Sequence, residues 1–568
     1  MTPATAPGTN RTSVLLDRHQ ATLDGALAAI ASREYFSAYS ESPKAYGEAA
    51  SAAGAAAFQA LIGSRFQLDQ PTTGSWVGSE RSPYGFDLGV TYPEADVDAV
   101  LKSAAEALPA WRDAGVRART GVALEILARL NARSHEIAHA VMHTTGQAFA
   151  MAFQAGGPHA QDRALEAVAY AYSAMSSVPI EAVWEKPQGK RPPLRMRKSF
   201  AIAPRGVGLV IGCNTFPTWN SYPGLFASLV TGNPVIVKPS PLAVLPLAIT
   251  VSVAREVLAE AGFSRDLVTL AAENPGGRLA AELARRQEIR IIDYTGSTAF
   301  GEWLEREAPQ AAVFTEKAGI NCVVIDSTDD YHGMLENLAF TLSLYSGQMC
   351  TTTQNLYVPR AGVATDAGHK SFDDVATDLA TTIEKFLADT GRAAGVLGAI
   401  VNDDVLQRLE SAGGLGRVVL PTKAVTHPEH SGATVRTPTL IALDGPDDPV
   451  ASEEHFGPIT LLVPTDGTSA SLEAMRRAGR EHGAITAGAY STDEAVLAEA
   501  ERTALDAGVA LSLNLTGGVY VNQSAAFSDF HATGLNPAAN SSLTDLAFVT
   551  PRFHVVQSRR PATEPEAA

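Results

Sequence analysis

The residues best suited to chemistry in this sequence are an acid and a thiol, Glu316 and Cys350, which stand 34 residues apart. Cys350 lies in the segment Gly-Gln-Met-Cys-Thr-Thr-Thr, at 347–353. A cysteine acts as a nucleophile only when its surroundings favour the thiolate and leave the sulfur accessible. A carboxylate beside it can act as a general base. The pair predicts a nucleophile and a base, provided that the rest of the chain brings them into one site.

Composition limits the class of protein. The chain has 568 residues and a formal net charge of −17, which argues against a general nucleic-acid binder. Its start has no signal-peptide pattern, and no apolar run reaches the roughly 18 residues that a membrane helix needs. We therefore expect a cytoplasmic enzyme that contacts neither nucleic acid nor membrane. Three cysteines are too few for a disulfide framework, and Cys213 and Cys322 are interpreted as structural. No metal ligand is expected.

The elements that must position the pair alternate between strands and helices. Short runs rich in Val and Ile at 207–212, 233–239, 267–272 and 289–296 are separated by helical patterns. This alternation predicts a parallel sheet with helices on both faces, an α/β fold. Ligands of such sheets bind at the carboxyl ends of the strands. The turn Thr295-Gly296-Ser297 leaves a strand and enters a helix, so its backbone N–H groups could hold a pyrophosphate.

Two further segments stand out. Residues 1–90 contain helical patterns near 12–31 and 46–62 and then a turn-rich passage, and we interpret them as an extension that wraps a larger domain. Residues 186–198, KPQGKRPPLRMRK, are the one dense basic run, and their alternation predicts a strand. The run is either a solvated strand face or a contact for the phosphates of a cofactor or a coenzyme A ester.

A second α/β region is expected after Glu316. A helix pattern spans 117–145, and the apolar run LGAIVN at 397–402 is predicted to be a strand.

Motifs in a fixed order resemble those of the aldehyde dehydrogenase superfamily over residues 90–560. They are NTFP at 214–217, GNPVIVKPS at 232–240, TGSTAFG at 295–301, EKAGIN at 316–321, GQMCT at 347–351 and EEHFGP at 453–458. The resemblance implies an α/β fold with a Rossmann-type cofactor domain, an α/β catalytic domain and a small oligomerisation arm. We expect an N-terminal helical extension at 1–90, a cofactor-binding domain at 91–315 completed by part of the C-terminal region, a catalytic domain at 316–530, and an arm and tail at 531–568.

The resemblance also implies roles for individual residues. Cys350 would form a thiohemiacetal and then a thioester, and Glu316 would activate water, which favours release of a free acid. The usual oxyanion asparagine falls on Thr215, so either Asn214 is delivered by a bulged turn, as we favour, or Thr215 substitutes. His531 lies where relatives have substrate-loop residues. Cofactor contacts are expected from Lys238, Ser240, Gly296, Ser297, Glu454 and Phe456.

The cofactor expected from this resemblance is NADP, with NAD possible. Three residues after Lys238, NAD-preferring relatives often carry a glutamate that repels a 2′-phosphate. This chain has Pro241 there.

Within the superfamily, the first 90 residues and the phrase WVGSERSPYGFDLGVTYP resemble the PaaN group of phenylacetate degradation, which is related to the dehydrogenase part of PaaZ. This predicts oxidation of a coenzyme A-linked semialdehyde by a homodimer or homotetramer. Few residues follow Asn522, so any hydratase or hydrolase step would need a separate protein. The alternatives are a dehydrogenase for other aldehydes, a coenzyme A-acylating enzyme, and a catalytically weak scaffold in a pathway complex.

Overall fold

The first sheet carries the turns that the sequence places at a ligand-binding edge. The computed structural model describes residues 9–317 and 319–562. Five parallel strands lie in the order β11-β10-β7-β8-β9, with bounds β7 (Val207–Ile211), β8 (Val235–Lys238), β9 (Val268–Leu270), β10 (Ile289–Gly296) and β11 (Ala312–Lys317).

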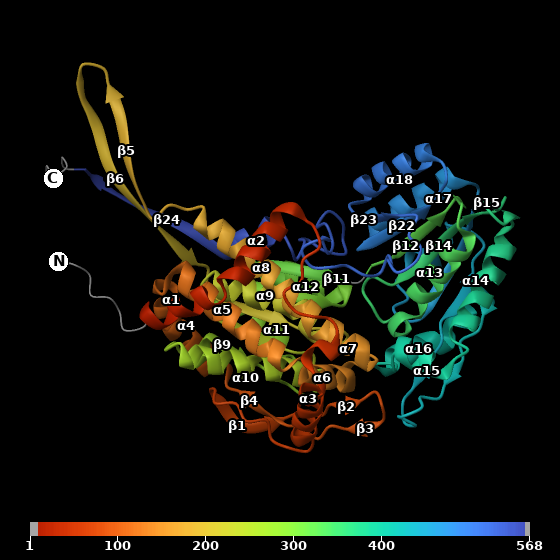
Figure 1. Cartoon of the computed structure of the whole chain (residues 1–568), viewed down its shortest axis with the longest axis horizontal. Coiled ribbons are helices and arrows are strands. Elements are labelled where there is room, and N and C mark those ends of the chain that lie inside the picture. The colour runs from red at the N-terminus through yellow and green to blue at the C-terminus, as the bar shows by residue number, and fades with distance from the viewer. Residues whose placement is uncertain (1–8, 318, 563–568) are drawn as a thin grey trace.

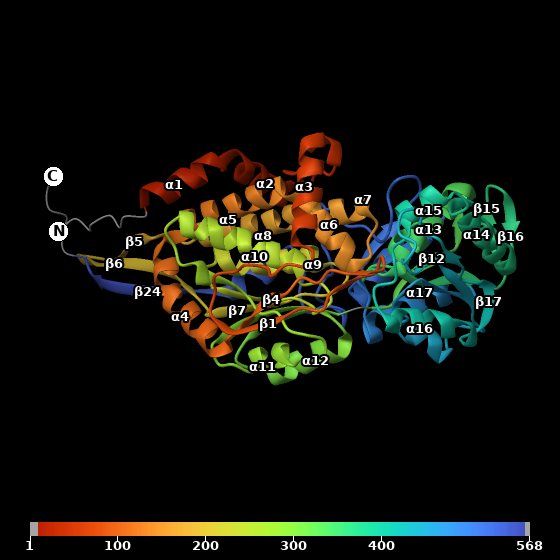
Figure 2. The same cartoon turned by 90° about the horizontal axis from the view of Figure 1, so that it is seen from below.

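Helices cover both faces of this sheet. Val210 packs into one apolar cluster with α9 (Pro217–Val230) and α10 (Leu245–Glu260), while its neighbours Leu209 and Ile211 pack into another. The second cluster includes α4 (Val97–Asp113), α11 (Leu279–Ala284) and α12 (Thr298–Glu307), and Figure 2 shows α11 and α12 on the opposite side from α9 and α10. Strands buried on both faces read as continuous apolar runs, which is why the sequence pattern predicted them.

The second sheet has seven strands in the order β17-β20-β21-β14-β12-β22-β23. Cys322 and Val324 face one apolar cluster and Val323 faces another, so Cys322 is a core residue. The predicted α/β fold is confirmed. The strand bounds are β12 (Asn321–Ile325), β14 (Thr353–Pro359), β17 (Arg417–Leu420), β20 (Thr439–Ala442), β21 (Ile459–Thr465), β22 (Thr486–Tyr490) and β23 (Ala510–Leu513).

The N-terminal helices pack on the body of the molecule. As Figures 1 and 2 show, α1 (Thr9–Arg18), α2 (Gln20–Ser32) and α3 (Glu48–Leu61) lie against α5 (Gly115–Ala132), α6 (Ser134–Thr145) and α8 (Pro158–Ser176). After α2, Arg33 Nη1 donates to Glu166 Oε1 at 2.9 Å, and the Glu166 side chain is wholly buried. A buried carboxylate needs such a partner, so this ion pair fixes the extension to α8.

A three-stranded antiparallel arm projects from the body (Figure 1), in the order β24-β6-β5. Its strands are β5 (Glu181–Gln188), β6 (Arg191–Pro204) and β24 (Phe553–Pro561). The basic run at 186–198 lies on this arm, as a strand hairpin, and β6 pairs with β5 and β24. This position favours the solvated strand face over a contact with cofactor phosphates.

Two local predictions were wrong. The predicted helix at 117–145 is divided at Arg133 into α5 and α6. Segment 397–402 is not a strand; among the described residues it makes only the isolated bridge between Ala399 and Val435. Its backbone groups bond to other loops and to side chains instead, since Ala399 N–H donates to the Gly146 carbonyl and Val401 N–H to Gln348 Oε1, both at 2.8 Å.

None of the described helices combines the length and the apolar character that a membrane crossing requires.

Candidate active site

Cys350 follows a tight turn in an unusual backbone conformation. After α13 (Tyr331–Ser343), residues Tyr345, Ser346 and Gly347 all adopt left-handed angles, with φ of 53°, 49° and 62°. Non-glycine residues pay for this conformation in strain, which persists only where the surroundings enforce it. Here Ser346 Oγ donates to the carbonyls of Gly398 and Arg436, both at 3.0 Å. Segment 397–402 therefore helps to hold the turn, through the Gly398 carbonyl.

Asn321 anchors the nucleophile to the second sheet. Its Nδ2 donates to the carbonyl of Cys350 at 2.8 Å and to that of Thr352 at 3.0 Å. Its Oδ1 accepts from Ile485 N–H at 2.9 Å and from Thr486 N–H at 3.0 Å. One buried amide thus joins the start of β12, the nucleophile loop and β22, which explains why the EKAGIN segment ends in asparagine.

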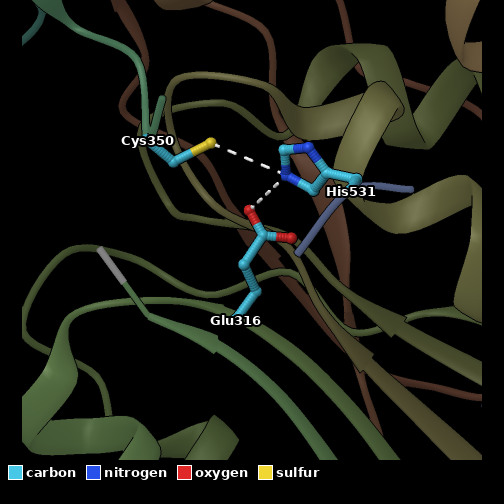
Figure 3. Close-up of side chains that lie close together, drawn as sticks. All are labelled: Glu316, Cys350 and His531. Carbon is cyan, nitrogen blue, oxygen red and sulfur yellow. Dashed lines mark hydrogen bonds and ion pairs between the residues drawn. The ribbon is translucent and has the colours of Figure 1, made fainter. Parts of the chain in front are cut away.

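The structure brings the predicted base and nucleophile together and adds a third residue, His531 (Figure 3). His531 Nε2 lies 3.0 Å from Glu316 Oε1 and 3.9 Å from Cys350 Sγ. The Glu316 carboxylate oxygen, the Cys350 sulfur and the His531 nitrogen all lie within 4.8 Å of one another. One ring nitrogen therefore faces both the predicted base and the predicted nucleophile.

The surroundings set the charge of this group. Burial acts to raise the pKa of Glu316, but His531 and the hydrogen-bonding groups around it lower the pKa below its ordinary value. Burial raises the pKa of the Cys350 thiol well above its ordinary value, and the Glu316 carboxylate raises it further. At rest the carboxyl is therefore ionised and the thiol is protonated, so that nucleophilic attack requires removal of a proton.

The two asparagines near the NTFP turn differ in their surroundings. Asn214 Nδ2 donates to the Thr144 carbonyl at 3.3 Å, while its buried Oδ1 has no hydrogen-bond partner among the residues that the structure describes. Asn220, in the first turn of α9, places Nδ2 3.2 Å from Glu316 Oε1. Asn220 lines the same cavity as Cys350. Neither the contact of Asn220 with Glu316 nor that of His531 with the pair was predicted from the sequence, because no local pattern joins positions so far apart in the chain.

Cys213 also lies beside this group, and its Sγ donates to Asn220 Oδ1 at 3.6 Å. Burial raises the pKa of Cys213 to about 11. Cys213 is therefore protonated at neutral pH and a poor nucleophile.

The cavity over Cys350 has a volume of about 540 Å³. Much of its wall is apolar or aromatic, including Phe216, Trp219, Phe340, Leu344, Met349 and Tyr520. The N-terminal extension supplies Tyr35, Phe36, Ser37 and Glu41 to the wall. The titratable side chains that line it are Tyr35, Glu41, His159, Asp162, Cys350, Tyr520 and His531, and no lysine or arginine is among the described lining residues.

Groups suited to a dinucleotide lie at the carboxyl edge of the first sheet. Gly296 ends β10, and α12 begins directly after Ser297, whose side chain does not cap the helix. The first N–H groups of α12 are therefore available to a pyrophosphate. A Cβ at position 296 would lie 2.5 Å from the Tyr294 hydroxyl, so this close turn requires glycine. These features fit a dinucleotide.

The same edge of the sheet carries an ion pair. Lys238 ends β8 and is buried, and its amine contacts the carboxylate of Glu273. Ser240 follows in the next turn, where its hydroxyl accepts from Leu242 N–H at 3.3 Å.

Across from this edge, the EEHF motif is fixed by Gln354 of β14. Gln354 Nε2 donates to the Glu453 carbonyl at 2.9 Å, and Gln354 Oε1 accepts from His455 N–H at 2.7 Å. Glu454 and Phe456 therefore lie on a turn that these two bonds hold.

Comparisons with known proteins agree with this geometry. The model of the aldehyde dehydrogenase family matches residues 90–541. The N-succinylglutamate 5-semialdehyde dehydrogenase of Paraburkholderia xenovorans is 26% identical over 453 residues, covering 78% of this chain and 84% of that protein. The protein of the same name from Burkholderia cenocepacia is 27% identical over 450 residues, covering 76% and 85%.

Among solved structures, the NAD-dependent aldehyde dehydrogenase from Burkholderia multivorans is 57% identical, with a TM-score of 0.95 and coverage of 96% of this chain and 99% of that one. The 1-pyrroline-5-carboxylate dehydrogenase from Thermus with bound NAD is 20% identical, with a TM-score of 0.71 and coverage of 93% and 99%, and supports the fold alone.

The strained turn before Cys350 yields a prediction. In Gly347→Ala, the new Cβ would lie 2.5 Å from the Gly457 carbonyl and 2.8 Å from Pro458 Cα, so the turn must shift. We expect turnover to fall by about 100-fold, the effect of a misplacement near 1 Å, as measured by NADH formation. Gly368→Ala is the control, because Gly368 is also left-handed (φ 92°) but nothing lies within 4 Å of its Cβ position. Equal activity of the two variants would refute the argument.

Proposed function

This chain belongs to the aldehyde dehydrogenase family, and we propose that it oxidises an aldehyde to the carboxylic acid with a nicotinamide dinucleotide as hydride acceptor. The observation that carries the proposal is the contact network of Cys350, Glu316 and His531 in a cavity that an aldehyde can enter. A half-buried thiol beside an ionised carboxylate meets the needs of covalent catalysis followed by hydrolysis.

The steps follow from the side chains present. Cys350 Sγ bonds to the carbonyl carbon and gives a thiohemiacetal. A nicotinamide dinucleotide held at the edge of the first sheet by Lys238 and the start of α12 would supply the hydride acceptor, and loss of hydride to it would leave a thioester on Cys350. Glu316 then takes a proton from the attacking water, the C–S bond breaks, and the acid leaves. The ionised state of Glu316 favours this hydrolysis over a coenzyme A-acylating reaction.

An oxyanion develops during each addition to the carbonyl carbon. We propose the backbone N–H of Cys350 as one donor. For the amide donor we now prefer Asn220 to Asn214, because Asn220 lines the cavity with Cys350, whereas Asn214 Nδ2 is directed to the Thr144 carbonyl. Asn220 would also orient Glu316, which it contacts.

Removal of the base separates the two halves of the reaction. Glu316→Gln keeps the shape but cannot accept the water proton, so we expect a single burst of NADH and then turnover slowed by about 10²–10⁴-fold. Rapid-mixing absorbance and intact-protein mass spectrometry of the acylated enzyme measure this. Cys350→Ala should form no NADH. Glu302→Gln, an exposed acid on α12, is the control and should behave as wild type. Steady NADH formation by Cys350→Ala would refute the mechanism.

The cofactor preference depends on Glu273. The sequence favoured NADP because Pro241 replaces a repelling glutamate, but the carboxylate of Glu273 contacts Lys238 at the same edge. A carboxylate there would bind ribose hydroxyls and repel a 2′-phosphate. We therefore propose NAD as the preferred cofactor, in agreement with the name of the Burkholderia multivorans structure.

Neutralising Glu273 tests this proposal. In Glu273→Gln we expect kcat/KM for NADP to rise relative to NAD by about tenfold, a change of about 1.4 kcal/mol in discrimination. Steady-state rates with both cofactors measure it. Glu282→Gln, on α11 of the same domain, is the control. An unchanged ratio, or a wild type that prefers NADP, would contradict the role of Glu273.

The cavity supports a substrate class. Its lining carries the Glu41 carboxylate and no described lysine or arginine, so a free carboxylate near the aldehyde would lack an ammonium or guanidinium partner and meet a like charge. We propose an aldehyde whose chain is uncharged within the cavity. N-succinylglutamate 5-semialdehyde, named for the relatives above, carries carboxylates and fits this lining poorly.

The coenzyme A-linked semialdehyde expected from the PaaN resemblance meets this requirement. A thioester masks the terminal carboxylate, so that the acyl chain is neutral. The PaaN resemblance rests on the sequence segments quoted above. The relatives compared with this chain carry other names.

A matched pair of substrates tests the class. We compare 6-oxohexanoate with its methyl ester, which differ mainly in the terminal charge, and expect kcat/KM to be at least about tenfold higher for the ester. Glu41→Gln should reduce the difference in kcat/KM between the acid and the ester, because it removes a carboxylate from the cavity wall. The coenzyme A thioester of the same acid forms a third arm, and a rate above that of the ester would favour the coenzyme A-linked substrate. A free acid that reacts as well as the ester would refute the proposal.

We also propose assembly into homodimers or homotetramers through the arm, and retain the division at residues 90, 315 and 530 as a proposal. The arm exposes apolar side chains on its strands, including Val183, Leu194, Val555 and Val556. An exposed sheet of this kind needs cover from another surface.

A further inference from the structure

His531 occupies a position that the proposed chemistry has not yet used. The side chain is 3% exposed, and its Nε2 faces both Glu316 Oε1 and Cys350 Sγ, at 3.0 Å and 3.9 Å. The ring of Trp219 meets the imidazole edge-on, with the centroids 4.5 Å apart. On the other side, Nδ1 lies 3.4 Å from Ser524 Oγ. These contacts fix the ring between the base and the nucleophile (Figure 3).

The thiol needs a proton acceptor that does not add negative charge beside the sulfur. Burial and the Glu316 carboxylate both raise the pKa of Cys350. A carboxylate alone therefore opposes formation of the thiolate. An imidazole that accepts the proton becomes positive, and a positive group between a thiolate and a carboxylate stabilises both anions.

We propose that His531 takes the thiol proton of Cys350 and holds it between the thiolate and Glu316. The proposal rests on the proposed function and assigns a positioning and proton-transfer role that deepens it. In this step the S–H bond breaks, its electron pair stays on sulfur, and an N–H bond forms at Nε2. The new imidazolium donates to Glu316 Oε1. Nε2 can accept only when Nδ1 carries the ring proton, and Ser524 Oγ lies where it can accept that N–H. In this form the Nε2 lone pair faces the ionised Glu316 Oε1 at 3.0 Å, and the new N–H replaces this repulsion with an ion pair, which favours the transfer.

The segment that carries His531 is built and held. Phe527 and Ala532, on either side of His531, adopt left-handed angles with φ of 66° and 64°. Arg163 Nη1 donates to the Asp529 carbonyl at 3.0 Å, and Asp529 Oδ2 accepts from Ala525 N–H at 2.7 Å. Such strain in non-glycine residues, enforced by specific bonds, is typical of functional segments.

The N-terminal extension holds the same segment from outside. Phe36 packs edge-on against Phe527, with ring centroids 5.0 Å apart, and the Arg33 guanidinium lies 4.0 Å from the centre of the Phe530 ring. Arg33 is itself fixed by Glu166 at 2.9 Å. The extension therefore supports the position of His531 without touching the nucleophile.

The experiment measures the reactivity of the thiol without aldehyde or cofactor. The charged and titratable groups near the imidazole are Glu316 from β11, Cys350 from its loop, and Arg163 of α8, which donates to Ser524 Oγ at 2.9 Å. Full-length enzyme is treated with iodoacetamide from about pH 6 to about pH 10, in EDTA. Mass spectrometry measures alkylation of the Cys350 peptide alone, so that alkylation of Cys213 or Cys322 is not counted.

In His531→Gln we expect alkylation of Cys350 at neutral pH to slow by at least about tenfold, and to converge with wild type at high pH, where hydroxide ionises the thiol directly. In His531→Ala, added imidazole should restore part of the rate, which a purely structural role would not allow. His332→Gln, an exposed histidine on α13, is the control.

Equal pH profiles for His531→Gln and wild type, or no rescue of a folded His531→Ala, would overturn the proposal. If both His531 variants fail to fold, Ser524→Ala decides, because loss of the Nδ1 partner should shift the alkylation profile to higher pH and an unshifted profile would count against the role. Failure here is distinct from failure of the proposed function, which would show as wild-type enzyme that forms no NADH with 6-oxohexanoate, its methyl ester or its coenzyme A thioester.

Discussion

The site depends on how the chain crosses from one sheet to the other. Strand β11 ends at Lys317 and β12 begins at Asn321, so the base on the first sheet and the anchor of the nucleophile on the second are five residues apart. Asn321 then fixes the carbonyl of Cys350 through its amide. Because this crossing is so short, the separation of Glu316 and Cys350 is set by backbone, with little freedom for side chains to change it.

Strain and hydrogen bonds complete this constraint. Three consecutive left-handed residues, Tyr345 to Gly347, aim the chain toward the cavity, and the segment at 398–401 holds them through side-chain to backbone bonds. Such an arrangement costs stability locally, and it is retained where a reacting atom must be presented in one orientation. The same bonds explain why the apolar run LGAIVN does not join a sheet.

Whether a feature of the fold or the site could be predicted from the sequence depends on how far apart in the chain its interacting residues lie. The apolar runs of β7 and β12 predicted the sheets, because burial on both faces leaves a local pattern, and the motifs around Glu316 and Cys350 were recognisable in the same way. The contact of His531 with Glu316 and the part played by Asn220 were not, because these contacts join positions 215 and 96 residues apart. The Glu273–Lys238 contact was missed for the same reason, and the left-handed Ser346 has no residue-type signal comparable to glycine.

The extension at residues 1–90 changes what the minimal unit of this protein is. The family match begins at residue 90, yet Phe36 and Arg33 cover Phe527 and Phe530, and Tyr35 to Ser37 form part of the cavity wall. A chain cut back to the matched region would keep every reacting group while exposing aromatic surface and opening the cavity to water. Selectivity can thus vary through an appended segment while the catalytic core stays constant, and a reshaped extension would offer a route to new substrates that leaves the chemistry untouched.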